Sequence, residues 1–169
     1  MKKILLSVEL ALIMIFAACT SFSYKVTESE AQEILRTGTY AVTIPDDYPG
    51  NAKSGRTTAL EIKSVLDDFL DDVTILSCVS DYKSLSPDEK AKYDYIVEPV
   101  INYWEDNLTA WTGKPDKLLL DINIYMSKTG QVLDKFTIDA KSSNMIIGEN
   151  DPVELIKSPA KAHYAKVLK

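Results

Sequence analysis

Alternation of apolar and polar residues between positions 118 and 140 places the strongest constraint on the fold. From Leu118 to Met126 every second residue is apolar, and the residues between them include Asp121 and Asn123. A turn-like segment, 127–130, follows, and a second alternating stretch runs from 132 to 140. This period of two is typical of strands with one buried and one solvated face. The pattern predicts a hairpin whose apolar face needs a covering layer.

Further patterns supply that layer and the rest of the sheet. Apolar residues at helical spacing predict a helix from Ser54 to about Leu70. Shorter helices are predicted at 27–35 and 86–93 from capping signals, and a last one after Asp151-Pro152. Strands are predicted at 39–44, 73–76, 95–104, 118–126 and 132–140.

We therefore predict an α/β (α+β) two-layer sandwich. Its mixed sheet has about five strands, with helices mainly on one face. Pro99 has no backbone donor, so it should occupy a bulge or an unpaired edge position. Leu66 and Phe69 should pack against the inward face of the hairpin, which carries Ile122, Ile124, Phe136 and Ile138.

The N-terminus has the pattern of a secretion signal. Lys2 and Lys3 precede a mostly apolar run over 4–18, which ends Phe16-Ala17-Ala18-Cys19. Small residues before a cysteine are typical of a bacterial lipobox, in which Cys19 takes the lipid; the alternative is an ordinary cleaved signal with an incidental cysteine. We divide the chain into signal peptide 1–18, tether with short helix 19–38 and one α/β domain 39–169. Thr20, by analogy with enterobacterial sorting, favours the outer membrane, on its periplasmic face.

Charge argues against one class of partner. The chain has 19 Lys and Arg against 25 Asp and Glu, a net charge of −6, whereas nucleic-acid binders carry a basic patch. Attraction to anionic headgroups is equally weak, so membrane attachment should come from acyl chains on Cys19. The second cysteine, Cys78, lies in an apolar stretch and is expected to be buried and inert.

Sequence signals for catalysis are weak. The run Asp67-Asp68-Phe69-Leu70-Asp71-Asp72 resembles the aspartate-rich box of prenyl-diphosphate enzymes over six residues, but a solvated helix face explains it better. His163 is the single histidine, lies among lysines and is expected at the surface. We predict no enzyme activity, no catalytic residue, no metal and no cofactor.

Side chains suited to binding are most concentrated around the two tryptophans. Five residues form the candidate binding surface: Trp104, Glu105, Asp106, Trp111 and Asp116. Indole rings beside carboxylates suit recognition of a sugar or a protein. Equally, the rings can cover the open end of the sheet while the acids cap turns.

Around these positions the chain resembles an uncharacterised family of small bacterial lipoproteins. The likeness rests on Trp104-Glu105-Asp106, Trp111, Gly113 and Pro115-Asp116, and extends to Gly55-Arg56, Glu98-Pro99, Thr129-Gly130 and Asp151-Pro152. The overall pattern is also similar to periplasmic modules such as the N-terminal domain of TolB. The resemblance implies an envelope location and this fold more than an activity.

The leading hypothesis is therefore a lipid-anchored, non-enzymatic periplasmic module that binds another envelope protein. The alternative is a small-ligand or glycan-binding lipoprotein that uses the loop from Trp104 to Asp116. A hydrolase is the third hypothesis, because no pair of a nucleophile and a general base can be identified in the sequence.

Overall fold

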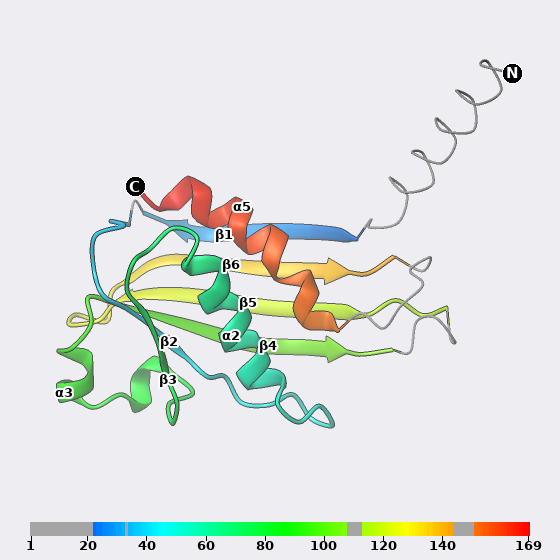
Figure 1. Cartoon of the computed structure of the whole chain (residues 1–169), viewed down its shortest axis with the longest axis horizontal. Helices are drawn as coiled ribbons and strands as arrows, with labels where there is room; N and C mark the ends of the chain where they lie inside the picture. The colour runs from blue at the N-terminus through cyan, green and yellow to red at the C-terminus, as the bar shows by residue number, and fades with distance from the viewer. Residues whose placement is uncertain (1–21, 33, 108–112, 144–150) are drawn as a thin grey trace, which may run out of the picture.

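The computed structural model describes residues 22–32, 34–107, 113–143 and 151–169. One sheet of six strands, in the order β1-β6-β5-β4-β2-β3, forms the framework (Figure 1). The strands are β1 (Ser23–Ala31), β2 (Tyr40–Thr43), β3 (Val73–Leu76), β4 (Tyr95–Glu105), β5 (Lys117–Met126) and β6 (Val132–Lys141). The helices are α2 (Ser54–Leu66), α3 (Pro87–Lys90) and α5 (Lys157–Val167), with 3-10 turns η1 (Tyr82–Ser84) and η2 (Pro152–Leu155).

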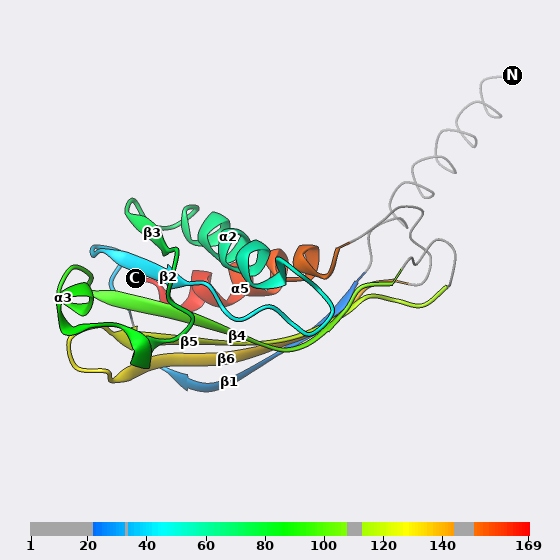
Figure 2. The ribbon, with the colours of Figure 1, turned by 90° about the horizontal axis from the view of Figure 1, so that it is seen from below.

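The predicted hairpin forms the centre of the sheet. β5 and β6 pair antiparallel, with Ile122 opposite Phe136, and their alternate residues are buried. Helices α2 and α5 lie together on one side of the sheet (Figure 2). Leu66 belongs to the core cluster that holds the inward hairpin residues, and Phe69 packs against it from a partly buried position. The predicted core and two-layer fold are confirmed.

Parallel pairing makes the sheet mixed, as expected. β2 runs parallel to both β3 and β4, and α2 connects β2 with β3. β2 pairs with β4 only as far as Val97. Pro99 therefore lies where β4 has a neighbour on one side alone, which agrees with the predicted edge position.

The segment that contains η1 and α3 covers one end of the opposite face. Leu85 packs there with Ile96 of β4, and the Tyr82 ring stacks on Tyr125 at 4.6 Å. Beside these rings the buried carboxylate of Glu98 accepts hydrogen bonds from the Tyr82 amide and the Tyr125 hydroxyl. Burial, reinforced by the Glu98 carboxylate, raises the pKa of Tyr125 to about 12 and keeps its hydroxyl a donor. This polar contact fixes the small second cluster to the sheet.

The helix predicted at 27–35 is wrong, because residues 27–31 belong to β1 and Ile34 forms an isolated parallel bridge with Leu168. β1 pairs antiparallel with β6, with Val26 opposite Ile138 and Glu28 opposite Phe136. Thr27 and Glu30 have the spacing of a capping box, but β6 would otherwise leave a long row of backbone groups unpaired at the sheet edge. Long-range pairing satisfies those groups and outweighs the local helical signal. The sheet consequently has six strands where about five were expected.

Two leucines of α2 test the packing. Leu66 is fully buried against the sheet, whereas Leu60 on the same helix is 46% exposed. We expect Leu66→Ala to lower the free energy of unfolding by about 2–5 kcal/mol through lost burial and a residual cavity. Leu60→Ala should change it by less than about 1 kcal/mol. Urea unfolding followed by circular dichroism measures both, and equal effects would contradict the assigned face of α2.

Candidate functional site

Trp104 of the candidate binding surface is a packing residue in this structure. It is 5% exposed and belongs to the main core cluster. Together with Asp106, Asp151 and α2 residues such as Thr57, it lines a hollow of about 210 Å³. Asp106 itself is exposed. Trp111 lies outside the described residues, so its role as a binding residue stays a prediction.

Glu105 is engaged in an ion pair at the end of β4. Its carboxylate lies 2.7 Å from the Lys117 ammonium and accepts a hydrogen bond from the Tyr103 hydroxyl at 2.9 Å. The Lys117 contact, followed by that of Tyr103, lowers the pKa of Glu105 to about 2. Both side chains are partly exposed to solvent, which screens the charges, so the pair contributes little to stability. It joins the last residue of β4 to the first residue of β5.

Asp116 closes the base of the connection between β4 and β5. Its side chain is fully buried and accepts a hydrogen bond from the Asn107 amide at 2.7 Å. On the other side, the Ser142 hydroxyl lies 3.3 Å from the second carboxylate oxygen and accepts from the Asp116 amide at 2.8 Å. Asp116 thus joins this connection to the end of β6, which supports the packing interpretation for this residue.

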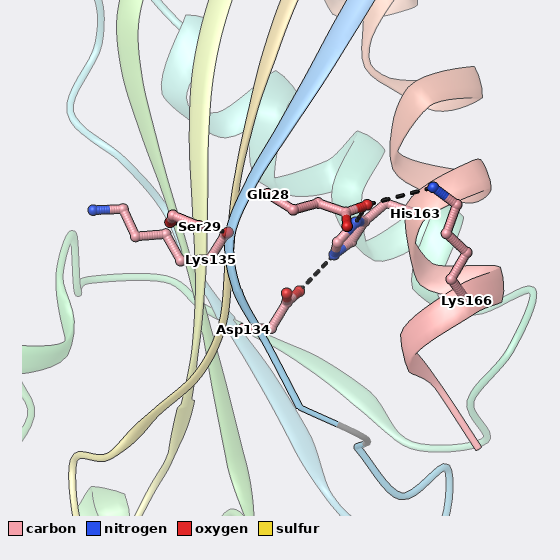
Figure 3. A network of polar contacts seen from close by, with 6 residues as sticks. All are labelled: Glu28, Ser29, Asp134, Lys135, His163 and Lys166. Carbon is pink, nitrogen blue, oxygen red and sulfur yellow. Dashed lines mark hydrogen bonds and ion pairs between the residues drawn. The ribbon is translucent and has the colours of Figure 1, made fainter.

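A buried polar cluster that the sequence analysis did not predict lies between α5 and the sheet edge formed by β1 and β6. His163 of α5 is 1% exposed, so its expected surface position is wrong. Its Nε2 lies 2.7 Å from Asp134 of β6, and its Nδ1 lies 3.1 Å from Glu28 of β1 (Figure 3). The imidazole also stacks on Phe136, with ring centroids 3.8 Å apart. The spacing of His163 from the buried Ala160 and Val167 was the available helical signal.

This cluster connects three elements. Each ring nitrogen of His163 faces one carboxylate, so the imidazole of α5 lies between a residue of β1 and a residue of β6. The hydrogen bond from His163, aided by Lys166 at 3.4 Å, lowers the pKa of Glu28. The second oxygen of Asp134 is buried and has no hydrogen-bond partner among the residues that the structure describes. Both ring nitrogens are occupied by carboxylates, which suits a structural connection better than proton transfer.

The expectation of a buried Cys78 is also wrong, because its side chain is exposed. It follows the edge strand β3 and lines a hollow of about 520 Å³ beside Arg56 and Lys53. Asp47 occupies the start of α2 there, accepting from the amides of Lys53 and Gly55 at 2.9 and 2.8 Å. A side chain at Gly55 would meet the Pro45 carbonyl at 1.9 Å, so glycine is required at this position.

The acidic run after α2 is exposed, as expected. Asp67 pairs with Lys63 at 2.7 Å. Asp68 pairs with Lys161 of α5 at 2.7 Å, and this contact lowers the pKa of Asp68. The Asp68–Lys161 pair joins the end of α2 to α5, whereas the Asp67–Lys63 pair lies along α2 itself. Within the described part of the chain, no helix is long and apolar enough to cross a membrane.

Comparison with known families assigns the domain. Residues 36–168 match the family described as domain of unknown function DUF4823. The chain belongs to this family. The expected membership in a family of unknown function is thereby supported, while the tryptophan signature and the likeness to TolB stay predictions. The match begins after β1, so that strand precedes the family domain. A search of curated proteins gave no match.

Solved structures share the fold. PelC from Paraburkholderia phytofirmans, described as a dodecamer, superposes with a TM-score of 0.69 at 12% identity, covering 86% of this chain and 97% of PelC. A single-residue variant of PelC gives a TM-score of 0.65 at 11% identity, covering 86% of this chain and 97% of the variant. Lipoprotein GNA1162 from Neisseria meningitidis gives 0.45 at 12% identity, covering 76% and 99% respectively. At 12% and 11% identity, the likeness to PelC concerns the fold alone.

A double-mutant cycle tests the buried cluster. His163→Leu leaves the buried Asp134 carboxylate without its partner, and we expect a loss of about 3–5 kcal/mol in the free energy of unfolding. Adding Asp134→Leu removes the stranded charge and should recover much of that loss. Urea unfolding of the two single variants and the double variant measures the coupling. Additive effects of the two substitutions would show that the contact contributes nothing specific.

Proposed function

We propose that this chain is a lipid-anchored, non-enzymatic interaction module at the periplasmic face of the outer membrane. The observation that carries the proposal is the position of β1, which begins at Ser23, only four positions after the lipobox cysteine Cys19. A chain processed at Cys19 would carry its acyl chains directly next to a folded strand. Several acyl chains hold a protein on a membrane far more firmly than one chain does.

The side chains that could act as a general acid or base are engaged in structural contacts, which supports a non-enzymatic role. His163 has carboxylates at both ring nitrogens, and Asp116 is committed to the amide of Asn107 and to Ser142. A general base needs a free position within hydrogen-bond reach of the proton it removes. These groups hold strands and helices together instead.

The partner we propose is protein of the envelope, including further copies of this chain. PelC, whose fold extends over 86% of this chain, is described as a dodecamer. A module fixed to a membrane at one point gains binding strength from neighbouring copies, because each further contact forms at a high local concentration. Self-association thus fits a small anchored domain.

Glycan or small-ligand binding is the second candidate. The hollow beside Trp104 and Asp106 favours it, since an indole and a carboxylate there line one concave surface. Its volume of about 210 Å³ is below the range of roughly 300–1,000 Å³ that small-molecule sites occupy. This hollow suits one small polar group better than a sugar chain.

Substitution of the two cysteines tests the anchor. Cys19→Ala should leave the protein unprocessed or release it from the membrane fraction, since the acyl chains provide the attachment. Cys78→Ala, the matched control at the exposed thiol, should remain in the membrane fraction with an acylated N-terminus. Mass spectrometry of the mature N-terminus measures the modification.

An unacylated mature N-terminus at any other residue would contradict the proposal. The binding role is tested with the same two proteins, each used to capture partners from native envelope extract. Recovery of a glycan alone would favour the second candidate, and recovery of envelope protein by the Cys78→Ala control would support the first.

A further inference from the structure

Strand register defines which end of the domain lies near Cys19. Ser23 at the start of β1 is opposite Lys141, the last residue of β6, and Lys141 is opposite Lys117 at the start of β5. Lys117 is in turn opposite Glu105, the last residue of β4. Four strands therefore end on one row, at the end of the sheet shown on the right in Figure 1. The candidate residues Trp104, Glu105, Asp106 and Asp116 lie at or next to this same end, where β4 ends and β5 begins.

The short segment between Cys19 and Ser23 keeps this row of strand ends close to the proposed lipid anchor. Four residue steps separate Cys19 from Ser23, and a fully extended chain of that length spans at most about 14 Å. The opposite end, with the turn at 127–130, lies one full strand away, roughly 33 Å for the ten residues of β5. An acylated Cys19 therefore brings the row of strand ends, and not the 127–130 turn, near the headgroups.

The surface at this end has residues suited to an interface. Tyr24 is 45% exposed and Tyr103 is 40% exposed, although both are large rings. Tyr24 is at the level of Trp104, the neighbour of Tyr103, through the register of β6 and β5. Tyrosine has an apolar body and a polar tip, which suits the boundary between headgroups and water. Lysine can add an ammonium that reaches toward phosphate.

Charge at this end is close to balanced. Lys117 is paired with Glu105, and Lys141 is exposed at the end of β6. The contact therefore does not depend on a strongly anionic leaflet, in agreement with the net charge of −6. Burial of aromatic area and the nearby acyl chains supply the attraction instead.

We propose that the anchor-proximal end, defined by Tyr24, Tyr103, Lys117 and Lys141, rests on the lipid headgroups of the leaflet that holds Cys19. This inference rests on the proposed lipid anchor. The sheet then stands on the membrane by one end, and Glu105 and Asp106 of the candidate surface lie at that end. The turn at 127–130 and the η1–α3 segment lie away from the membrane, where an envelope partner can reach them.

Depth-dependent quenching on vesicles tests this orientation. The full lipidated chain carries Cys78→Ser, so that an introduced cysteine is the single reactive thiol after acylation of Cys19. Lys141→Cys places a bimane probe at the anchor-proximal end, and Lys128→Cys places it at the far turn. Both lysines are exposed, so the two variants are matched. The vesicles contain phosphatidylethanolamine, phosphatidylglycerol and a brominated phosphatidylcholine quencher.

We expect the probe at position 141 to be quenched several-fold more strongly than the probe at position 128. Equal quenching, as for a domain lying flat, would overturn the orientation, and so would stronger quenching at 128. Absence of quenching at both positions also overturns it when mass spectrometry finds Cys19 acylated. An unacylated N-terminus at another residue, by contrast, is a failure of the proposed anchor itself. Circular dichroism of both variants verifies that they fold.

Discussion

His163 lies between Asp134 of β6 and Glu28 of β1, and the place of the N-terminal strand depends on this contact. The imidazole is buried against Phe136, so its polar atoms have exchanged water for two carboxylates. Removing one member of such a group leaves a buried charge unpaired, which costs far more than the contact itself contributes. The cluster therefore specifies one position for α5 and one position for β1.

The fixed position of β1 matters for the whole molecule, because this strand lies between Cys19 and the rest of the sheet. β1 begins directly after the residues that connect it to Cys19, and it is an edge strand paired with β6 over most of its length. A flexible linker would let the domain take any direction, as chains without regular structure do. A strand held by backbone pairing and by Glu28 would instead fix the sheet relative to the proposed anchor at Cys19. The family match over 36–168 starts after this strand, so β1 couples the family domain to its N-terminus.

Much of the fold could be predicted because its signals are local or periodic. The alternation at 118–140 defines the hairpin, and Ser86 with Glu89 forms the predicted capping box at α3. β1 could not be found this way, because its pairing with β6 joins residues more than 100 positions apart, while a nearer helical capping signal was present. The burial of His163 follows from the same long-range contact, since its two acids come from distant strands.

The candidate site was also predicted only in part from the sequence. The sequence shows that Trp104, Glu105 and Asp116 are close together along the chain. Their roles, however, depend on which strands pair at this end of the sheet. Trp104 points into the core and Asp116 bonds across to Ser142, so these two stabilise the end of the sheet. The residue type alone does not tell whether a tryptophan side chain is buried in the core or exposed to solvent. The register supplies that distinction, and it also places this end beside the proposed anchor.

Amide hydrogen exchange of the full chain, purified from membranes in detergent, tests the central claim that strand β1, which follows the proposed anchor, is an integral part of the fold. The amides of β1 that donate to β6 should exchange about as slowly as their neighbours in β6, because both open only when the sheet opens. Exchange of every amide over residues 23–31 at the rate of an unstructured chain, with β6 still protected, would contradict the account.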